Sequence, residues 1–172
     1  MGRPFAYGRG VTEPALHPAV EPLAFLLGTW RGRGHGEYPT IDPFDYVEEV
    51  VFAHVGKPFL AYQQRTRHAV TDLPLHAETG YLRPVDLEGA RELSVELVLA
   101  HPSGVLELAQ GGLHGTELRL ATTSVVVTPT AKDVNAVERD VKVDGDVLTY
   151  VLRMAAVGVP LTHHLAAELH RA

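Results

Sequence analysis

Residues 28–41 read Gly-Thr-Trp-Arg-Gly-Arg-Gly-His-Gly-Glu-Tyr-Pro-Thr-Ile, with glycines at every second position from Gly32 to Gly36. A β-strand places alternate residues on one face, so these glycines would leave that face without side chains. Each interior glycine costs a helix about 1 kcal/mol relative to alanine, which argues against a helix here. A bare strand face lets a flat group or a second backbone approach closely. The stretch therefore predicts either a bent barrel strand or a strand beside a bound ligand.

The composition is that of an ordinary globular domain. The chain has 172 residues, 45% of them hydrophobic and 21% charged, and a formal net charge of −6. The negative charge argues against a nucleic-acid partner, because such binding relies on a basic surface. No cysteine is present, which excludes disulfides and thiolate chemistry and suits a reducing cytosol without requiring it. We predict a cytoplasmic protein with no membrane partner, since no signal-peptide core and no apolar run of about 20 residues is found.

From residue 28 onward, short runs with β character alternate with turn signals. The runs cover residues 28–38, 44–54, 59–68, 75–83, 92–100, 105–110, 117–128, 134–143, 147–157 and 162–171. Asp144-Gly145 is the clearest hairpin turn. In the last run, Leu161, Leu165 and Leu169 recur every four residues, which leaves a terminal helix open as an alternative.

Ten short antiparallel strands with little helix predict an all-β fold. We expect a closed up-and-down β-barrel, because closure removes exposed strand edges. Residues 22–27 are expected to form a short helical or turn segment that plugs one end. We expect residues 1–20, rich in proline, glycine and alanine, to be a loosely ordered lead-in, and residues 21–172 to be the barrel domain.

The histidines are the strongest candidate metal ligands in the chain. His163 and His164 are adjacent, so on a regular strand only one of them can face the lumen. Alternation puts His163 on the apolar face, although a ligand-filled lumen can reverse which face is apolar. Six further histidines lack the spacing of a zinc site and are expected to be mostly solvated: His35, His54, His68, His76, His101 and His114.

Other catalytic patterns are not supported. Glu48 and Glu49 would face opposite sides of a strand and cannot share a substrate as glycosidase carboxylates do. The glycines at 32, 34 and 36 are not a dinucleotide fingerprint, because no helical pattern follows them. Ser103 and Ser124 lack the surroundings of a nucleophile elbow.

Residues 26–41 resemble the Gly-x-Trp-x-Gly-x-Gly signature of the nitrobindins. Similar segments follow in the same order at residues 44–49, 56–66, 76–83 and 161–169, the last reading Leu-Thr-His-His-Leu-Ala-Ala-Glu-Leu. The resemblance spans the chain from residue 15 onward. It implies a ten-stranded antiparallel barrel, related in shape to fatty-acid-binding proteins, that holds haem b near its mouth.

The resemblance also implies site residues. His164 matches the family's axial iron ligand and would be the catalytic residue, with His163 as the alternative that alternation favours. A group that the sequence does not identify should hold the other ring nitrogen. Thr40 matches a threonine beside the haem, and we add Lys132 as a contact to a haem propionate or edge. The signature residues expected at the cofactor site are Gly28, Trp30, Gly32 and Gly34.

The implied activity is isomerisation of peroxynitrite to nitrate at ferric haem, with nitric oxide binding at the same open position. One alternative is a carrier of fatty acid or another apolar ligand, which would need arginine and tyrosine converging in the lumen. Arg153 and Tyr150 have opposite strand parity and do not suit that role. The other alternative is a haem protein that senses nitric oxide without turnover. A homodimer formed through an outer face is also expected.

Overall fold

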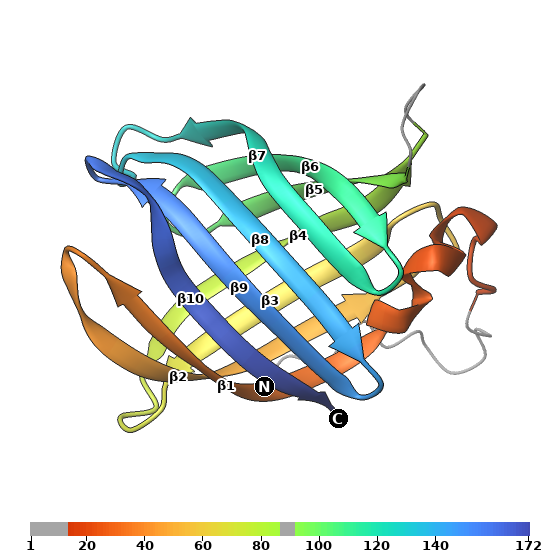
Figure 1. Cartoon of the computed structure of the whole chain (residues 1–172), viewed down its shortest axis with the longest axis horizontal. Coiled ribbons are helices and arrows are strands. Elements are labelled where there is room, and N and C mark those ends of the chain that lie inside the picture. The colour runs from red at the N-terminus through yellow and green to blue at the C-terminus, as the bar shows by residue number, and fades with distance from the viewer. Residues whose placement is uncertain (1–13, 87–91) are drawn as a thin grey trace.

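A computed structural model describes residues 14–86 and 92–172 of the chain (Figure 1). A 3₁₀ helix, η1 (Pro18–Leu26), precedes ten strands. These are β1 (Gly28–Tyr38), β2 (Ile41–Ala53), β3 (Leu60–His68), β4 (Pro74–Val85), β5 (Leu93–His101), β6 (Val105–His114), β7 (Glu117–Val127), β8 (Val134–Asp144), β9 (Val147–Ala156) and β10 (Val159–Arg171). No helix among the described residues has the length and apolarity needed to cross a membrane.

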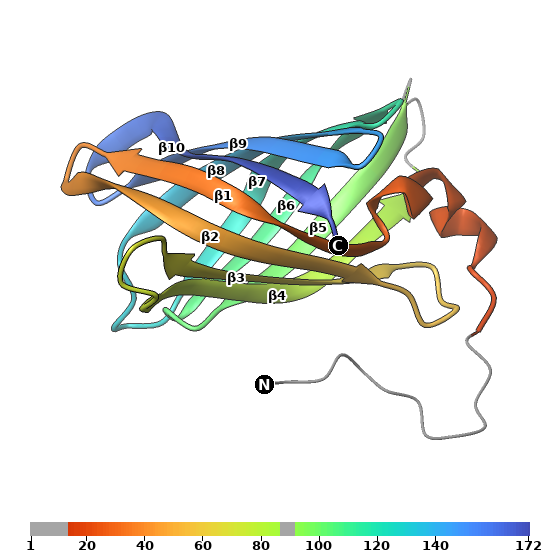
Figure 2. The same ribbon diagram turned by 90° about the horizontal axis from the view of Figure 1, so that it is seen from below.

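The strands close into one antiparallel barrel, which confirms the predicted fold (Figures 1 and 2). Each strand pairs with its sequence neighbours, and β1 pairs with β10. The turns that follow odd-numbered strands therefore lie at one end, called here the β1–β2 end. The helix η1 lies at the opposite end, called here the η1 end (Figure 2).

The structure differs from the sequence predictions at the two ends of the chain. The last run is β-strand throughout, so the terminal helix suggested by the leucine spacing is wrong. Both edges of this segment are paired in the sheet, because β10 hydrogen-bonds to β1 on one side and to β9 on the other. Of the predicted lead-in, residues 1–13 lie outside the described residues, and residues 18–20 belong to η1.

The hydrophobic core is concentrated at the η1 end. Val20, Leu23 and Leu26 of η1 are fully buried and belong to one cluster with Trp30. The indole N–H of Trp30 donates to the Leu26 carbonyl at 2.7 Å, and the Arg171 guanidinium lies 4.1 Å from the ring centroid. A helix this short owes its stability to packing, so η1 acts as the plug predicted from the sequence.

The bare face of β1 admits a neighbouring backbone and two aromatic rings. At Gly32, Gly34 and Gly36 an added Cβ would lie within 2.4 Å of another atom. The nearest groups are the Glu168 carbonyl at Gly32, the Tyr46 ring at Gly34 and the Phe44 ring at Gly36. The close approach expected of this face is therefore made by the protein's own groups.

Candidate functional site

His164 lies at an irregular point of β10. The pairing of β10 with β9 steps from His163↔Arg153 to Leu165↔Leu152, so His164 is an extra residue, a β-bulge. Paired residues share a face, and Arg153 is bonded to acidic groups of the neighbouring strand β8. His163 is thus on the outer face, which corrects the placement expected from alternation. Alternation failed because the bulge interrupts it.

The His164 imidazole is held in one tautomer. Its Nδ1 lies 3.0 Å from the backbone carbonyl of Glu37. A carbonyl can only accept, so Nδ1 carries the proton and Nε2 keeps a lone pair. Burial lowers the pKa of His164, although the hydrogen bond to Glu37 opposes that shift, and the ring is favoured in its neutral form. A neutral imidazole fixed in this way is suited to bind a metal.

Tyr38 supports the same region. Its ring meets that of His164 edge to face, with centroids 5.2 Å apart. Its hydroxyl accepts the Ala156 N–H at 2.9 Å and lies 3.2 Å from the Met154 carbonyl. These contacts tie the end of β1 to the end of β9, so the strands flanking the bulge are fixed relative to each other.

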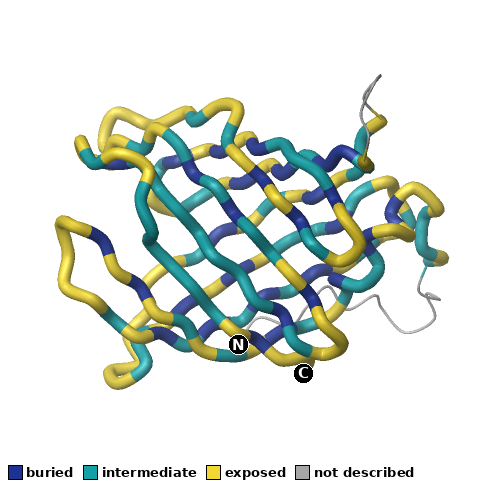
Figure 3. Tube along the Cα trace, in the orientation of Figure 1, coloured by how far each residue is buried: buried dark blue, intermediate teal, exposed yellow. Residues whose placement is uncertain are grey.

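The parts of β9 and β10 around His164 are incompletely buried. All residues from Thr149 to Ala155 and from Thr162 to Ala167 are only partly buried, as the teal runs of Figure 3 show. Leu152, Met154 and Leu165 lie on the inner face by alternation and pairing. The residues present thus offer apolar walls and a free imidazole nitrogen, which fits a planar, largely apolar cofactor that carries a metal.

The pairing of β7 with β8 is also incomplete toward the β1–β2 end. The described β7–β8 pairing runs only from Glu117↔Lys142 to Ala121↔Glu138. Beyond it the Thr122 hydroxyl accepts the Val137 N–H at 3.0 Å. The turn that follows β7 carries Lys132, an exposed cation at the β1–β2 end.

The predicted site residues do not all lie together. Thr40 in the β1–β2 turn and Lys132 in the β7–β8 turn are exposed at the same end as His164. Trp30 pairs with Arg171, seven residues along β10 from His164, or about 23 Å at the rise of an extended strand. Gly28 precedes Trp30 and lies at the η1 end with it. The structure therefore brings Thr40 and Lys132 to the end that holds His164, and places Trp30 and Gly28 in β1 at the η1 end.

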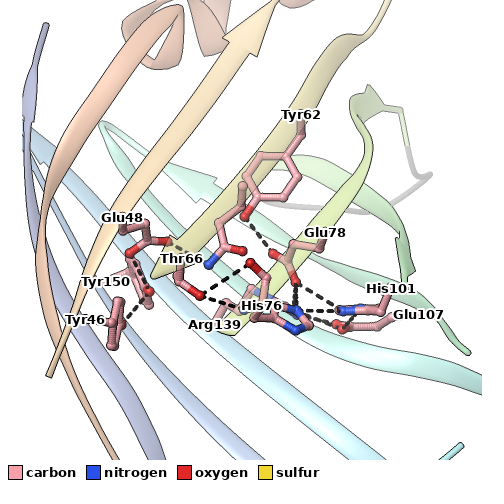
Figure 4. Close-up of polar contacts among 11 residues, drawn as sticks. Tyr46, Glu48, Tyr62, Thr66, His76, Glu78, His101, Glu107, Arg139 and Tyr150 are labelled. Atoms are coloured by element: carbon pink, nitrogen blue, oxygen red, sulfur yellow. Dashed lines mark hydrogen bonds and ion pairs between the residues drawn. The ribbon is translucent and has the colours of Figure 1, made fainter. Parts of the chain in front are cut away.

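Between the two ends, a buried polar network crosses the lumen (Figure 4). We call it the lumen cluster, and it comprises Tyr46, Glu48, Tyr62, Gln64, His76, Glu78, His101, Glu107, Arg139 and Tyr150. Sequence reasoning missed it, because each strand contributes only one or two members.

One half of the lumen cluster surrounds Glu48. This carboxylate accepts from the Gln64 amide at 2.9 Å and from the Tyr150 hydroxyl at 2.8 Å. Tyr46 lies 2.7 Å from Tyr150, hydroxyl to hydroxyl. Burial raises the pKa of Glu48 to about 7. Glu49 is on the outer face with Arg31, so the predicted opposition of the two glutamates is confirmed.

The other half surrounds Arg139. Its guanidinium donates to both carboxylate oxygens of Glu107 and lies 3.5 Å from Glu78. Burial alone would raise the pKa of Glu78, but the Arg139 charge and hydrogen bonds lower it to about 2. Tyr62 donates to the same carboxylate at 2.6 Å.

The Arg139 half of the lumen cluster is relevant to the alternative that the barrel carries a fatty acid or another apolar ligand. A buried arginine and a partly buried tyrosine do converge in the lumen, as carboxylate capture would require, but they are Arg139 and Tyr62. Tyr62 and Arg139 already bind the protein's own carboxylates. A ligand carboxylate would therefore have to displace those of Glu78 and Glu107. Arg153 binds Glu138 and Asp140 while Tyr150 points inward, as their opposite parity predicts.

Of the six histidines expected to be mostly solvated, His76 is exposed, whereas the His101 side chain is only 9% exposed. The two are in contact: His76 Nε2 lies 3.2 Å from His101 Nδ1, and both approach Glu78. Their spacing along the chain did not reveal this contact. His76 and Glu78 are two residues apart on one strand face, and the pairing Thr79↔Ala100 sets Glu78 opposite His101. That hairpin register is the signal from which the contact follows.

Two hollows of about 510 and 600 Å³ lie on the surface. The first follows β7–β9, and the second lies over β9, β10, β1 and β2. Their linings are mostly outward-facing side chains and include neither His164 nor the Arg139 half of the lumen cluster. Both hollows are therefore separate from the surroundings of His164.

Comparison with known proteins places these features in context. Residues 19–171 match the family described as the THAP4-like, heme-binding beta-barrel domain. Peroxynitrite isomerase 2 of Mycobacterium avium (strain 104) is 59% identical over 160 residues, covering 91% of this chain and 96% of that protein. Peroxynitrite isomerase of Nocardia farcinica (strain IFM 10152) is 54% identical over 169 residues, covering 94% and 98%. The crystal structure of Rv2717c from M. tuberculosis superposes with a TM-score of 0.82 at 53% identity, covering 92% and 99%.

Proposed function

The chain belongs to the family of THAP4-like, heme-binding β-barrel domains, and from this premise we propose that it binds haem b through His164 and isomerises peroxynitrite to nitrate. Relatives named peroxynitrite isomerase, 54% and 59% identical over nearly the whole chain, support the activity. A haem cofactor also suits this activity, because the cofactor supplies the reactive centre.

The observation that carries the proposal is the state of the His164 ring. The Glu37 carbonyl accepts a hydrogen bond from Nδ1–H, and burial favours the neutral ring by lowering its pKa. Histidines that ligate metals donate their other ring N–H in this way, which fixes the tautomer and makes the ligating nitrogen more basic. Glu37 thereby takes the role of the partner that the sequence left unidentified.

Other residues of the chain would hold the cofactor and limit its access to water. Leu152, Met154 and Leu165 supply apolar contacts on the inner face. The Lys132 ammonium and the Thr40 hydroxyl stand at the same end, where they can meet carboxylates at a haem edge. When bound, the haem iron supplies a Lewis-acid centre that promotes the rearrangement of peroxynitrite to nitrate. We propose that nitric oxide binds at the same open position.

A haem titration followed by absorption spectroscopy tests the ligand. We expect a Soret band of bound ferric haem in the wild type and in His163→Ala, and its loss in His164→Ala. The His163 variant is the matched control, since it removes the neighbouring imidazole from the outer face. Loss of the band only in His163→Ala would refute the assignment of His164, and no uptake by the wild type would refute the haem proposal.

Turnover separates the isomerase from the nitric oxide sensor. We expect the haem-loaded protein to accelerate peroxynitrite decay with nitrate as product, and His164→Ala treated with the same haem to give only the background rate. A loaded protein that binds nitric oxide but leaves peroxynitrite decay unchanged would favour sensing.

Two further proposals concern the protein's setting. We propose a homodimer formed through the outer face of β4–β7, where Tyr81, Val98, Leu106, Leu108 and Val126 are exposed. Exposed apolar patches commonly mark interaction sites. Light scattering on the wild type and on Leu106→Glu tests the dimer, which the charged variant should dissociate. We also propose a cytoplasmic location, which fractionation of cells tests.

A further inference from the structure

Three donor atoms of the lumen cluster form a small triangle, visible at the right of Figure 4. His76 Nε2 is 3.2 Å from His101 Nδ1 and 3.6 Å from Glu78 Oε2, and His101 Nδ1 is 3.4 Å from the same oxygen. A tetrahedral ion with bonds of about 2.0–2.2 Å separates its ligand atoms by about 3.3–3.6 Å. We propose that His76, Glu78 and His101 form a second metal site, distinct from His164, for a divalent transition ion such as Zn²⁺.

The charge in the lumen favours a cation at this point. Glu78 and Glu107 face a single guanidinium, that of Arg139, so the three groups leave one negative charge when the histidines are neutral. The Arg139 guanidinium, 3.5 Å from Glu78, favours the ionised form of that carboxyl group. A metal ligand must be deprotonated, and this carboxylate meets that condition. The Arg139 charge lies 3.5 Å from the same oxygen and sets an upper limit to the affinity.

The surroundings of the triangle are those of a supported metal site. Tyr62 donates to the second oxygen of Glu78, which leaves Oε2 directed at the histidines. The Thr66 hydroxyl accepts the backbone N–H of His76 at 3.0 Å and anchors that residue. Such outer partners orient metal ligands and raise their basicity.

His101 provides a second, independent indication. Its side chain is 9% exposed, and its Nε2 is buried with no hydrogen-bond partner in the described residues. A buried ring nitrogen without a partner is costly. Metal at Nδ1 would place the proton on Nε2, which lies 3.6 Å from the Glu107 carboxylate. The carboxylate–histidine–metal arrangement thus explains the orientation of this ring.

The site is accessible and has a free coordination position. The His76 side chain is 40% exposed, whereas those of Glu78 and His101 are 7% and 9% exposed. Two histidines and one glutamate are three ligands, and zinc sites with three protein ligands keep a fourth position for water or substrate.

Isothermal titration with ZnCl₂ and absorption titration with CoCl₂ test the site, using the full chain without an affinity tag. We expect one Zn²⁺ per chain and the visible bands of tetrahedral Co²⁺. His76→Gln removes a ligand that is partly exposed, so the variant should fold, and its affinity should fall at least about tenfold. His101→Asn should have the same effect.

The matched control is His170→Gln. His170 lies 3.3 Å from Glu168 on the outer face, so this pair has the same residue types and spacing without the third ligand. We expect His170→Gln and His164→Ala to bind Zn²⁺ as the wild type does. Absence of binding in the wild type, or binding that survives His76→Gln, would overturn the proposal. Loss of Zn²⁺ in His164→Ala would also overturn it, because the ion would then share the axial histidine. The haem assignment is judged separately by the Soret band.

Discussion

The two ends of the barrel are built from the same ten strands but are filled differently. At the η1 end, Leu169 and Leu148 are 0% and 2% exposed and lie in the core with η1. At the β1–β2 end, Leu165 and Leu152 occupy the same face of the same strands and remain only partly buried. Full burial of a leucine contributes about 1.5–3 kcal/mol. The barrel therefore gains its stability mainly at one end, and leaves space beside His164 at the other.

The largest predicted effect tests this contrast directly. Leu169→Ala should lower the free energy of unfolding by about 2–5 kcal/mol, because it leaves a cavity in a closed core. Leu165→Ala, on the same strand and face, should lower it by about 1 kcal/mol, since its site is already partly open. Urea denaturation of the two variants measures both values. Equal losses would show that the two ends are equally packed.

A second prediction concerns the lumen cluster, where the closed end meets the open one. The pKa of Glu48 is about 7 in the folded chain against 4.5 for a free side chain. Between these pH values the folded chain holds a proton that the unfolded chain has lost, so stability falls as pH rises. Glu48→Gln removes this loss, because glutamine does not titrate. The free energy of unfolding of the variant minus that of the wild type, measured by urea denaturation, should therefore rise by about 2–3 kcal/mol from pH 5 to pH 8.

Glu78 is the control for that experiment, because its pKa is shifted the other way. Its pKa of about 2 means that it contributes stability above pH 4.5, which is lost as pH falls toward 2. As pH rises from about 2 to 4.5, the free energy of unfolding of Glu78→Gln should therefore fall further below that of the wild type. A difference for Glu48→Gln that does not change with pH would contradict the burial argument.

A third prediction concerns the tight packing of β1 at Gly34. A Cβ at Gly34 would lie 2.2 Å from Cζ of Tyr46, a buried ring whose hydroxyl is bonded to Tyr150. We expect Gly34→Ala to cost about 1–3 kcal/mol in urea denaturation, since the ring must move. Gly112→Ala is the control, because its nearest neighbour is the exposed Glu92 side chain at 3.1 Å, which can rotate away. Similar costs at both positions would contradict this view of β1.

The smallest predicted effect is on the outer face of the barrel, which serves as a reference for the lumen. Arg31 and Glu49 form an ion pair at 2.8 Å with side chains 62% and 40% exposed. Exposed pairs contribute little, so Arg31→Ala should change the free energy of unfolding by no more than about 0.5 kcal/mol. A thermal or urea denaturation series at two salt concentrations measures it. A loss as large as that of Leu169→Ala would mean that the outer face shares in the stability assigned to the lumen.

Much of the fold could be predicted from the sequence, because strand alternation and turn residues are local signals. β1 has the predicted bounds, Gly28–Tyr38. The leucine spacing in the last run misled, because a four-residue repeat over so short a segment does not distinguish helix from strand when both neighbours of β10 are available for pairing. Local patterns in a single strand do not specify the residues with which that strand will pair.

The site was less predictable, and for the same reason. A β-bulge is decided by the pairing of two strands, so the choice between His163 and His164 could not be made from β10 alone. The partner of the His164 ring is a backbone carbonyl, that of Glu37, which no side-chain motif reports. Arg139 and Glu107 are 32 residues apart and meet only because the barrel closes.

The closure of the barrel by its last strand has a consequence for biosynthesis. A ribosome delivers β10 after the other nine strands, and β1 must leave its edge unpaired until β10 arrives. His164 takes its place beside Glu37 only when that seam forms, because the hydrogen bond joins β10 to β1. Until β10 has been made, the nascent barrel thus exposes its inner face and an open strand edge, a state prone to aggregation. Its proposed iron ligand is among the last parts to be put in place, so the cofactor would be acquired after translation of the barrel is complete.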